Sequence, residues 1–186
     1  MAVGAKTSFE WPTNIATPPV TLFLEPLKPG EHFTNLPLAS QTLARKHVPQ
    51  ALAETRLQKV DPAVTPVIVD VDGSKCHWMR DCCPCLTRSR ASNGGHWLLL
   101  RGRRLSVTEQ ERLMGYHIVP PSGGHRVRLQ RPADVSIRSW GALLGNSIPV
   151  PLLARTLCRA LPAANLSGPL PDVWQPRQIR GVLRGS

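Results

Sequence analysis

The sequence is poor in aromatic side chains, with five Trp, three Phe and one Tyr among 186 residues. It has no run of eighteen apolar residues, so no membrane-spanning helix is expected. Residues 1–20 lack the continuous apolar stretch of a secretory leader, and we therefore expect free cysteines rather than disulfides. With 19 prolines and 14 glycines as well, the chain is not expected to build a self-sufficient hydrophobic core.

Lysine is absent after residue 75, although the net charge is +11. Residues 1–75 carry seven basic and seven acidic side chains, whereas residues 76–186 carry sixteen Arg and five acids. The planar Arg fork suits phosphates and guanine edges, so this excess favours a DNA partner. The alternative is that these arginines keep a basic protein soluble or pair with carboxylates on a missing domain. The candidate DNA-binding residues flank the expected strands and are Arg88, Arg90, Arg101, Arg103 and Arg104.

The stretch 103–116 reads Arg-Arg-Leu-Ser-Val-Thr-Glu-Gln-Glu-Arg-Leu-Met-Gly-Tyr and predicts a short capped helix. Ser106 and Glu109 have the spacing of a capping box, in which each side chain accepts a hydrogen bond from the other residue's backbone N–H. Gly115 can take the left-handed conformation that ends a helix. We expect a helix of about two turns.

A second stretch, Gly-Asn-Ser-Ile-Pro-Val at 145–150, lies between two predicted helices. We expect the first helix over 135–144, ending at Gly145, and the second with Ser147 as its cap, because prolines are tolerated in a first turn. Apolar residues then recur at helical spacing, forming an apolar stripe of Val150, Leu153, Ala154, Leu157, Cys158 and Leu161.

These two stretches resemble the ninth and tenth conserved motifs of DNA cytosine-5 methyltransferases. The resemblance implies structural roles for Glu109, Arg112 and Gly115, with Arg112 supporting the target-recognition region. It also implies that Asn146 and Ser147 line the S-adenosyl-L-methionine pocket, where the N–H groups of a helix start form a polar site. Weaker similarity extends the match to about residues 9–161. After Tyr116 the family usually continues with Pro, but His117 follows here.

The resemblance implies an α+β fold with three parts. Residues 1–100 would form a small mixed target-recognition region with short strands, 101–163 a C-terminal segment with both motifs, and 164–186 a disordered tail. In the family these C-terminal helices pack on a Rossmann-like domain that binds the methyl donor, and the Gly-rich turn of that domain is absent here. In the family the nucleophile is a Cys that follows Pro and precedes Gln. Here Cys85 follows Pro84 but precedes Leu86, so no catalytic residue is assigned.

The function implied is that of a methyltransferase fragment, which contributes DNA target recognition and one wall of the cofactor pocket and is not catalytic alone. Its expected partners are DNA and a separate catalytic domain or chain, and its location is nuclear in a eukaryote and otherwise cytoplasmic. The alternative is a non-catalytic DNA-binding or regulatory module. Because no sheet in this sequence covers the apolar stripe, we predict an exposed hydrophobic patch.

Four residues, Cys76, His77, Cys82 and Cys85, have a conceivable zinc-knuckle spacing. Only a short loop separates the two pairs, which favours free thiols, and no metal is assigned. The alternation over 67–71 predicts a strand that leads into a tight turn at Asp72-Gly73.

Three further expectations concern regular structure and histidines. Pro49 is expected to divide the helical stretch 36–57 into two short helices or a helix and a loop. A strand is expected over 98–100 and a loop over 118–132. His47, His96 and His125 are expected to be ordinary surface or interface residues.

Overall fold

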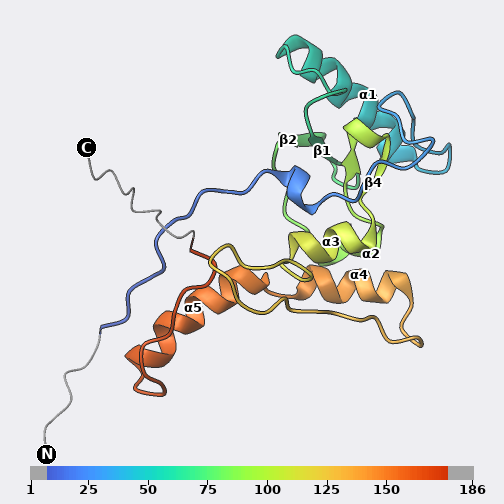
Figure 1. The fold of residues 1–186 in the computed structure, drawn as a ribbon. Helices are drawn as coiled ribbons and strands as arrows, with labels where there is room; N and C mark the ends of the chain where they lie inside the picture. The colour runs from blue at the N-terminus through green and yellow to red at the C-terminus, as the bar shows by residue number, and fades with distance from the viewer. Residues whose placement is uncertain (1–7, 176–186) are drawn as a thin grey trace, which may run out of the picture.

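The computed structural model describes residues 8–175 and combines helices with one small antiparallel sheet (Figure 1), which confirms the expected α+β class. Along the chain the elements are η1 (Val20–Phe23), α1 (Thr42–Leu57), β1 (Val67–Asp70), β2 (His77–Arg80), α2 (Arg88–Ser92), β3 (Trp97–Leu98), η2 (Leu99–Arg101), β4 (Arg103–Arg104), α3 (Val107–Leu113), α4 (Ile137–Asn146) and α5 (Val150–Ala163).

The four strands are ordered β2-β1-β3-β4, and every neighbouring pair is antiparallel. The predicted strand at 67–71 is confirmed as β1. The strand expected over 98–100 is shorter, because β3 ends at Leu98 and the chain turns through η2 into β4. The expected boundary between residues 1–100 and residues 101–163 falls before β4. β4 is nevertheless an edge strand of this sheet, so the sheet contains strands from both expected parts.

Both faces of β1 are buried, because successive side chains of a strand point to opposite faces. Val67 and Val69 belong to a core cluster with Ala44 and Val48 of α1. Ile68 belongs to a second cluster, together with Val20 of η1, Leu98 and Leu105. The sheet is therefore covered by α1 on one face and by η1 and the start of α3 on the other.

The helix α1 is a single element that contains Pro49, so the predicted division at this residue is wrong. Proline lacks an N–H group and normally disfavours a helix interior. Here Pro49 is exposed, while Val48 and Ala51 beside it are buried in the core. Burial of this apolar face offsets the lost backbone hydrogen bond.

The helix α4 crosses α2 with glycines at the contact. It runs from Ile137, capped by Ser136, to Asn146, so the predicted end at Gly145 is wrong. A Cβ atom on Gly141 would stand 2.3 Å from the carbonyl oxygen of Ala91 in α2, and Gly145 has a similar close neighbour. These two glycines, four residues apart, lie on one face of α4 and let the α2 backbone approach.

The segment after α5 folds back on the helix. Arg155 is largely buried and pairs with Asp172, with 2.7 Å between Nε and Oδ2, and Trp174 is also buried. Arg155 also donates to the carbonyl of Thr13, so the N-terminal segment runs beside α5 before it reaches η1 (Figure 1). The prediction of a disordered tail is therefore wrong for 164–175, and its remainder lies outside the described residues.

Two of the three histidines expected at a surface are buried. His47 and His96 are 1% and 0% exposed, whereas His125 is exposed as expected. His47 lies on the α1 face that packs on the sheet, and His96 precedes the buried strand β3. The sequence shows no pattern at these positions that distinguishes a core histidine from a surface one.

The loop expected over 118–132 is confirmed, since it contains no helix or strand. Within residues 8–175, none of the helices has the length and apolar character needed to cross a membrane.

Candidate functional site

The capping box at the start of α3 is confirmed. The N–H of Glu109 donates to Ser106 Oγ over 3.1 Å, and the N–H of Ser106 donates to Glu109 Oε2 over 2.8 Å. The side chain of Glu109 is completely buried. The carboxylate therefore lies inside the protein, where a charge requires partners.

Arg103 is the principal partner of Glu109. Its Nη1 and Nη2 atoms donate to Oε2 and Oε1 of Glu109 over 2.8 and 2.9 Å, and its Nε donates to Glu31. The N–H of Glu25 donates to Glu109 Oε1 over 3.0 Å. Burial alone would raise the pKa of Glu109, but these bonds outweigh it and lower the pKa below 4.5. This network of Glu25, Glu31, Arg103 and Glu109 ties the segment before α1 to α3.

Four of the five candidate DNA-binding arginines pair with carboxylates of this chain. Arg104 forms a two-pronged pair with Asp72, with both N–O distances 2.8 Å. Arg90 pairs with Asp70 at 2.9 Å, and Arg101 and Arg103 both pair with Glu31. Arg88 alone of the five is exposed and has no carboxylate partner among residues 8–175. The guanidinium groups of the four serve mainly the internal structure.

The sequence did not identify the carboxylates of these pairs as partners of the arginines. Glu31, Asp70 and Asp72 come from the neutral first 75 residues, and their partners come from the Arg-rich remainder. The only sign of these pairs in the sequence is the distribution of acidic residues over 1–75 and of arginines over 76–186. It indicates that acids in the first part can neutralise arginines in the second, but no spacing identifies the pairs.

Arg112 and Gly115 both make contacts within the described structure. Arg112 donates to the carbonyl of Leu24 over 3.2 Å, which holds the segment after η1. Gly115 has φ +88°, and a Cβ there would stand 2.4 Å from Pro151 Cδ. The N–H of Val150 donates to the carbonyl of Met114 over 2.8 Å. The two stretches that resemble conserved motifs therefore touch each other in space.

The turn between α4 and α5 holds the two candidate cofactor residues. Ser147 ends α4 and donates its hydroxyl to the carbonyl of Leu144 over 2.7 Å, so the prediction that it caps the next helix is wrong. Pro149 occupies the cap of α5 and forms no side-chain cap. The side chain of Asn146 is exposed. Of the two, Asn146 has the side chain that is accessible to a ligand.

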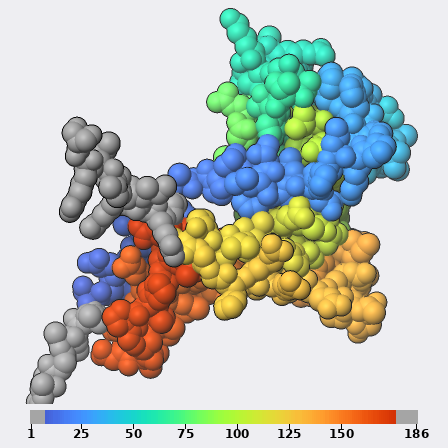
Figure 2. All heavy atoms as spheres, viewed as in Figure 1, coloured from blue at the N-terminus to red at the C-terminus, as the bar shows by residue number. Residues whose placement is uncertain are grey.

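The apolar stripe of α5 is largely uncovered. Leu153 and Leu157 are 43% and 41% exposed, and Cys158 is the stripe residue that is buried. Ile148 and Leu152 extend the exposed surface, as does Leu143 of α4. In Figure 2 the α5 region extends away from the part built around the sheet. The predicted hydrophobic patch is therefore present on the described structure.

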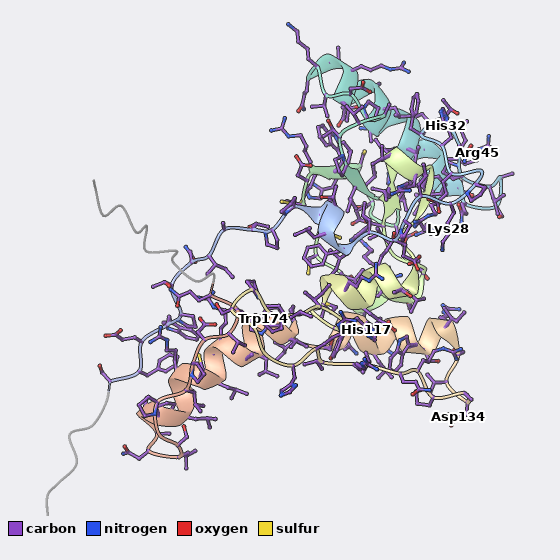
Figure 3. The ribbon with its side chains drawn as sticks, in the orientation of Figure 1. Lys28, His32, Arg45, His117, Asp134 and Trp174 are labelled. Carbon is purple, nitrogen blue, oxygen red and sulfur yellow. The ribbon has the colours of Figure 1, made fainter. Side chains whose placement is uncertain are left out.

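Glu111 is a further residue that sequence analysis missed. Its Oε1 accepts from Trp140 Nε1 of α4 over 2.7 Å, and its Oε2 lies 3.0 Å from His117 Nε2. His117 is labelled in Figure 3. His117 has φ +61°, which a proline ring cannot adopt. The departure from the family after Tyr116 thus coincides with a backbone conformation that excludes proline.

The cysteines form no metal site in the part of the chain that the structure describes. No three His, Cys, Asp or Glu side chains there are placed to hold an ion. Cys76 packs against the α1 core and its thiol donates to the carbonyl of His47, whereas Cys85 is exposed. Burial raises the pKa of Cys83 to about 12. The zinc alternative is therefore not supported.

Comparison with models of protein families, with curated proteins and with solved structures finds no match to this chain.

Proposed function

We propose that this chain is the target-recognition and closing part of a DNA cytosine-5 methyltransferase and acts only with a separate catalytic part. The observation that carries the proposal is the contact between its two motif-like stretches. They are about thirty residues apart in the sequence. In the structure the N–H of Val150 donates to the carbonyl of Met114, and Pro151 packs against Gly115, where a Cβ atom would clash with it. Residues that resemble one family in sequence are thus neighbours in space.

The exposed surface of α4 and α5 supports a missing partner. Leu143, Ile148, Leu152, Leu153 and Leu157 are each 41–58% exposed. Five exposed apolar side chains within fifteen residues of sequence are typical of an interface. In the proposal this surface packs on the Rossmann-like domain that binds S-adenosyl-L-methionine.

The fit to S-adenosyl-L-methionine rests on one side chain. Asn146 is exposed at the turn before α5 and offers an amide to the cofactor, whereas the Ser147 hydroxyl already bonds to Leu144. In the complete enzyme the cofactor supplies the methyl group. The role of this chain would be to position the methyl donor with Asn146 and to orient DNA.

DNA contact in this proposal rests on exposed arginines other than the paired ones. Arg88, Arg126, Arg128 and Arg138 are exposed, and the ion pairs within residues 8–175 do not include them. Such residues neutralise phosphates and give salt-dependent binding. They equally favour the second candidate, a non-catalytic DNA-binding or regulatory module, because binding alone requires no cofactor.

A mixing experiment separates the two candidates. The chain is combined with the catalytic part of a DNA cytosine-5 methyltransferase that lacks its own ninth and tenth motifs, and methyl transfer to duplex DNA is measured. Methylation in the mixture alone supports the proposal. DNA binding by this chain with no methylation in any mixture overturns it and supports the second candidate. Asn146→Ala should raise the KM for S-adenosyl-L-methionine, whereas Asn14→Ala, also at an exposed position, serves as the control.

A further inference from the structure

Asn93 and Gly94 lie in the turn from α2 to β3, to which the proposed function gives no role. Asn93 is the residue that follows α2, with φ −89° and ψ 10°, and Gly94 has φ +90°. The side chain of Asn93 is exposed, and its amide has no hydrogen-bond partner in the part of the chain that the structure describes. An exposed amide beside a glycine is open to attack by the chain's own backbone, because glycine has no side chain that shields its nitrogen.

The residue that follows distinguishes Asn93 from the other asparagines. The chain has five asparagines, and all of them are exposed. At the other four, the next residue carries a side chain that crowds its backbone nitrogen. These four pairs are Asn14-Ile15, Asn35-Leu36, Asn146-Ser147 and Asn165-Leu166.

We propose that Asn93 is a site of self-modification by deamidation. The backbone nitrogen of Gly94 attacks Cγ of Asn93, so that a Cγ–N bond forms and the Cγ–Nδ2 bond breaks. The Gly94 nitrogen gives up its proton, ammonia leaves, and a five-membered cyclic imide remains. Water then opens this ring at either carbonyl, which gives aspartate or isoaspartate. Water is the only co-reactant.

The folded conformation restrains ring closure. The ring requires the Gly94 nitrogen to lie next to Cβ of Asn93, but at ψ 10° it nearly eclipses the Asn93 nitrogen instead. The N–H of Gly94 also donates to the carbonyl of Ala91 over 3.1 Å. Both restraints are lost when the last turn of α2 opens, and such local opening does not require the whole protein to unfold. The folded chain therefore reacts through this opening.

The helix α4 controls how easily the turn opens. A Cβ atom on Gly141 would stand 2.3 Å from the carbonyl oxygen of Ala91, which is the acceptor of the Gly94 N–H. The backbone of α4 thus lies directly against the last turn of α2, and the two helices are side by side in Figure 1. Packing of α4 on α2 slows the modification, and loss of this packing accelerates it.

The product disturbs the start of the sheet. Both products place a carboxylate at the C-terminal end of α2, where a negative charge is unfavourable, and isoaspartate also adds a methylene group to the backbone. Gly95 follows and is buried. Its carbonyl accepts from Arg104 over 2.6 Å, and a Cβ atom on it would stand 3.0 Å from Gln110 Cδ. Isoaspartate should therefore lower stability more than aspartate does.

The first test incubates the folded full chain at neutral pH and follows every asparagine by peptide mapping with mass spectrometry. Asn93 should convert to a mixture of aspartate and isoaspartate before any of the other four changes. Asn93→Gln should abolish the conversion at this position, because the same attack on glutamine needs a larger ring. Conversion of another asparagine first overturns the proposal. Conversion of Asn93 to aspartate alone overturns the imide route, because direct hydrolysis gives no isoaspartate.

A synthetic peptide of residues 88–98 sets the time scale, because it lacks the restraints of the fold. The peptide should react severalfold faster than the folded chain, and the chain unfolded in urea should react as fast as the peptide. An intact Asn93 in the folded chain after several half-lives of the chain unfolded in urea would restrict the reaction to unfolded protein and overturn the proposal. Equal rates in the folded and the unfolded chain would overturn the role of the α2 turn.

The last test compares two glycine variants of the full chain. Gly141→Ala should raise the rate at Asn93 severalfold, whereas Gly168→Ala, where nothing lies within 4 Å of a Cβ atom, should leave it unchanged. If Gly141→Ala does not fold, the comparison of folded and urea-unfolded wild type decides instead. An unchanged rate in a folded Gly141→Ala variant overturns the control by α4. None of these measurements depends on methyl transfer or DNA binding, so they are independent of the proposed function.

Discussion

A Cβ atom on Gly145 would stand 2.4 Å from the carbonyl oxygen of Thr87. Thr87 is the residue before α2, so this glycine fixes how closely α4 packs against that helix. Of all pairs of elements in the described structure, α2 and α4 are the most extensively packed against each other. Gly145, which the sequence suggests as a helix end, is therefore a residue at which α4 packs against α2.

Replacing Gly145 with Ala should destabilise the protein, although Ala is the better helix former. The methyl group forces α2 and α4 apart, and overpacking of this kind costs about 1–3 kcal/mol. The free energy of unfolding in urea measures the effect. Gly168→Ala is the matched control, because nothing lies within 4 Å of a Cβ there. Equal stability of the two variants would contradict the packing role.

Glu109→Gln should lower the free energy of unfolding by about 1.5–3 kcal/mol, because it removes one of the two carboxylates that hydrogen-bond to Arg103. The pKa of Glu109 is below its ordinary value of 4.5 in the folded protein. Its contribution is therefore fully present above that value and is lost as the pH falls through the folded pKa. In the variant, part of the acid sensitivity below pH 4.5 should disappear. Glu10→Gln, at an exposed residue, is the comparison, and a similar loss there would argue against the buried pair.

A second pH effect concerns His96, whose pKa is lowered mainly by burial, although Asp70 opposes the shift. Protonation would place a hydrogen on Nδ1, which is buried and has no hydrogen-bond partner, while Nε2 already lies 3.2 Å from the carbonyl of Pro84. A lowered folded pKa means that stability falls as the pH drops below 6.5. Urea unfolding at pH 7 and pH 5 should show this decrease in the wild type.

The variant His96→Gln keeps a side-chain donor and should show a smaller decrease between these pH values. His125→Gln, a change at an exposed residue, should behave as the wild type. A decrease that persists unchanged in His96→Gln would assign it to other groups.

The exposed surface of α5 should make the isolated chain associate. Size-exclusion chromatography with light scattering is expected to give a mass above the 20.4 kDa of the monomer. The double change Leu153→Asn and Leu157→Asn should restore the monomer, because it removes the centre of the apolar surface. Leu57→Asn, at an 83% exposed position on α1, should not. A monomeric wild type would show that the surface needs no partner.

The sequence predicts best where the signal is local. The capping box of Ser106 and Glu109 involves residues three apart, and its geometry follows from their spacing alone. The strand β1 and the apolar stripe of α5 likewise follow from periodicities of two and 3.6. Each of these depends on neighbours in the chain and not on the rest of the fold.

The predictions that failed depend on distant contacts. Pro49 lies inside a helix because the core on the opposite face holds it, and Gly145 lies inside another because α2 packs there. Arg104 pairs with Asp72 across 32 positions of the sequence. Residue type indicates that an arginine can bind an anion, but only the three-dimensional arrangement decides whether that anion is a carboxylate of the same chain.

The bond from Arg155 to Thr13 joins residues 142 positions apart, with a donor–acceptor distance of 2.7 Å. During synthesis this bond can form only after Arg155 has left the ribosome. Until then the N-terminal segment around Thr13 lacks its contact with α5, although α1 and the sheet can already assemble. Nascent-chain proteolysis between residues 8 and 19 would consequently stop only after α5 has emerged, which makes the closing step of folding a late one.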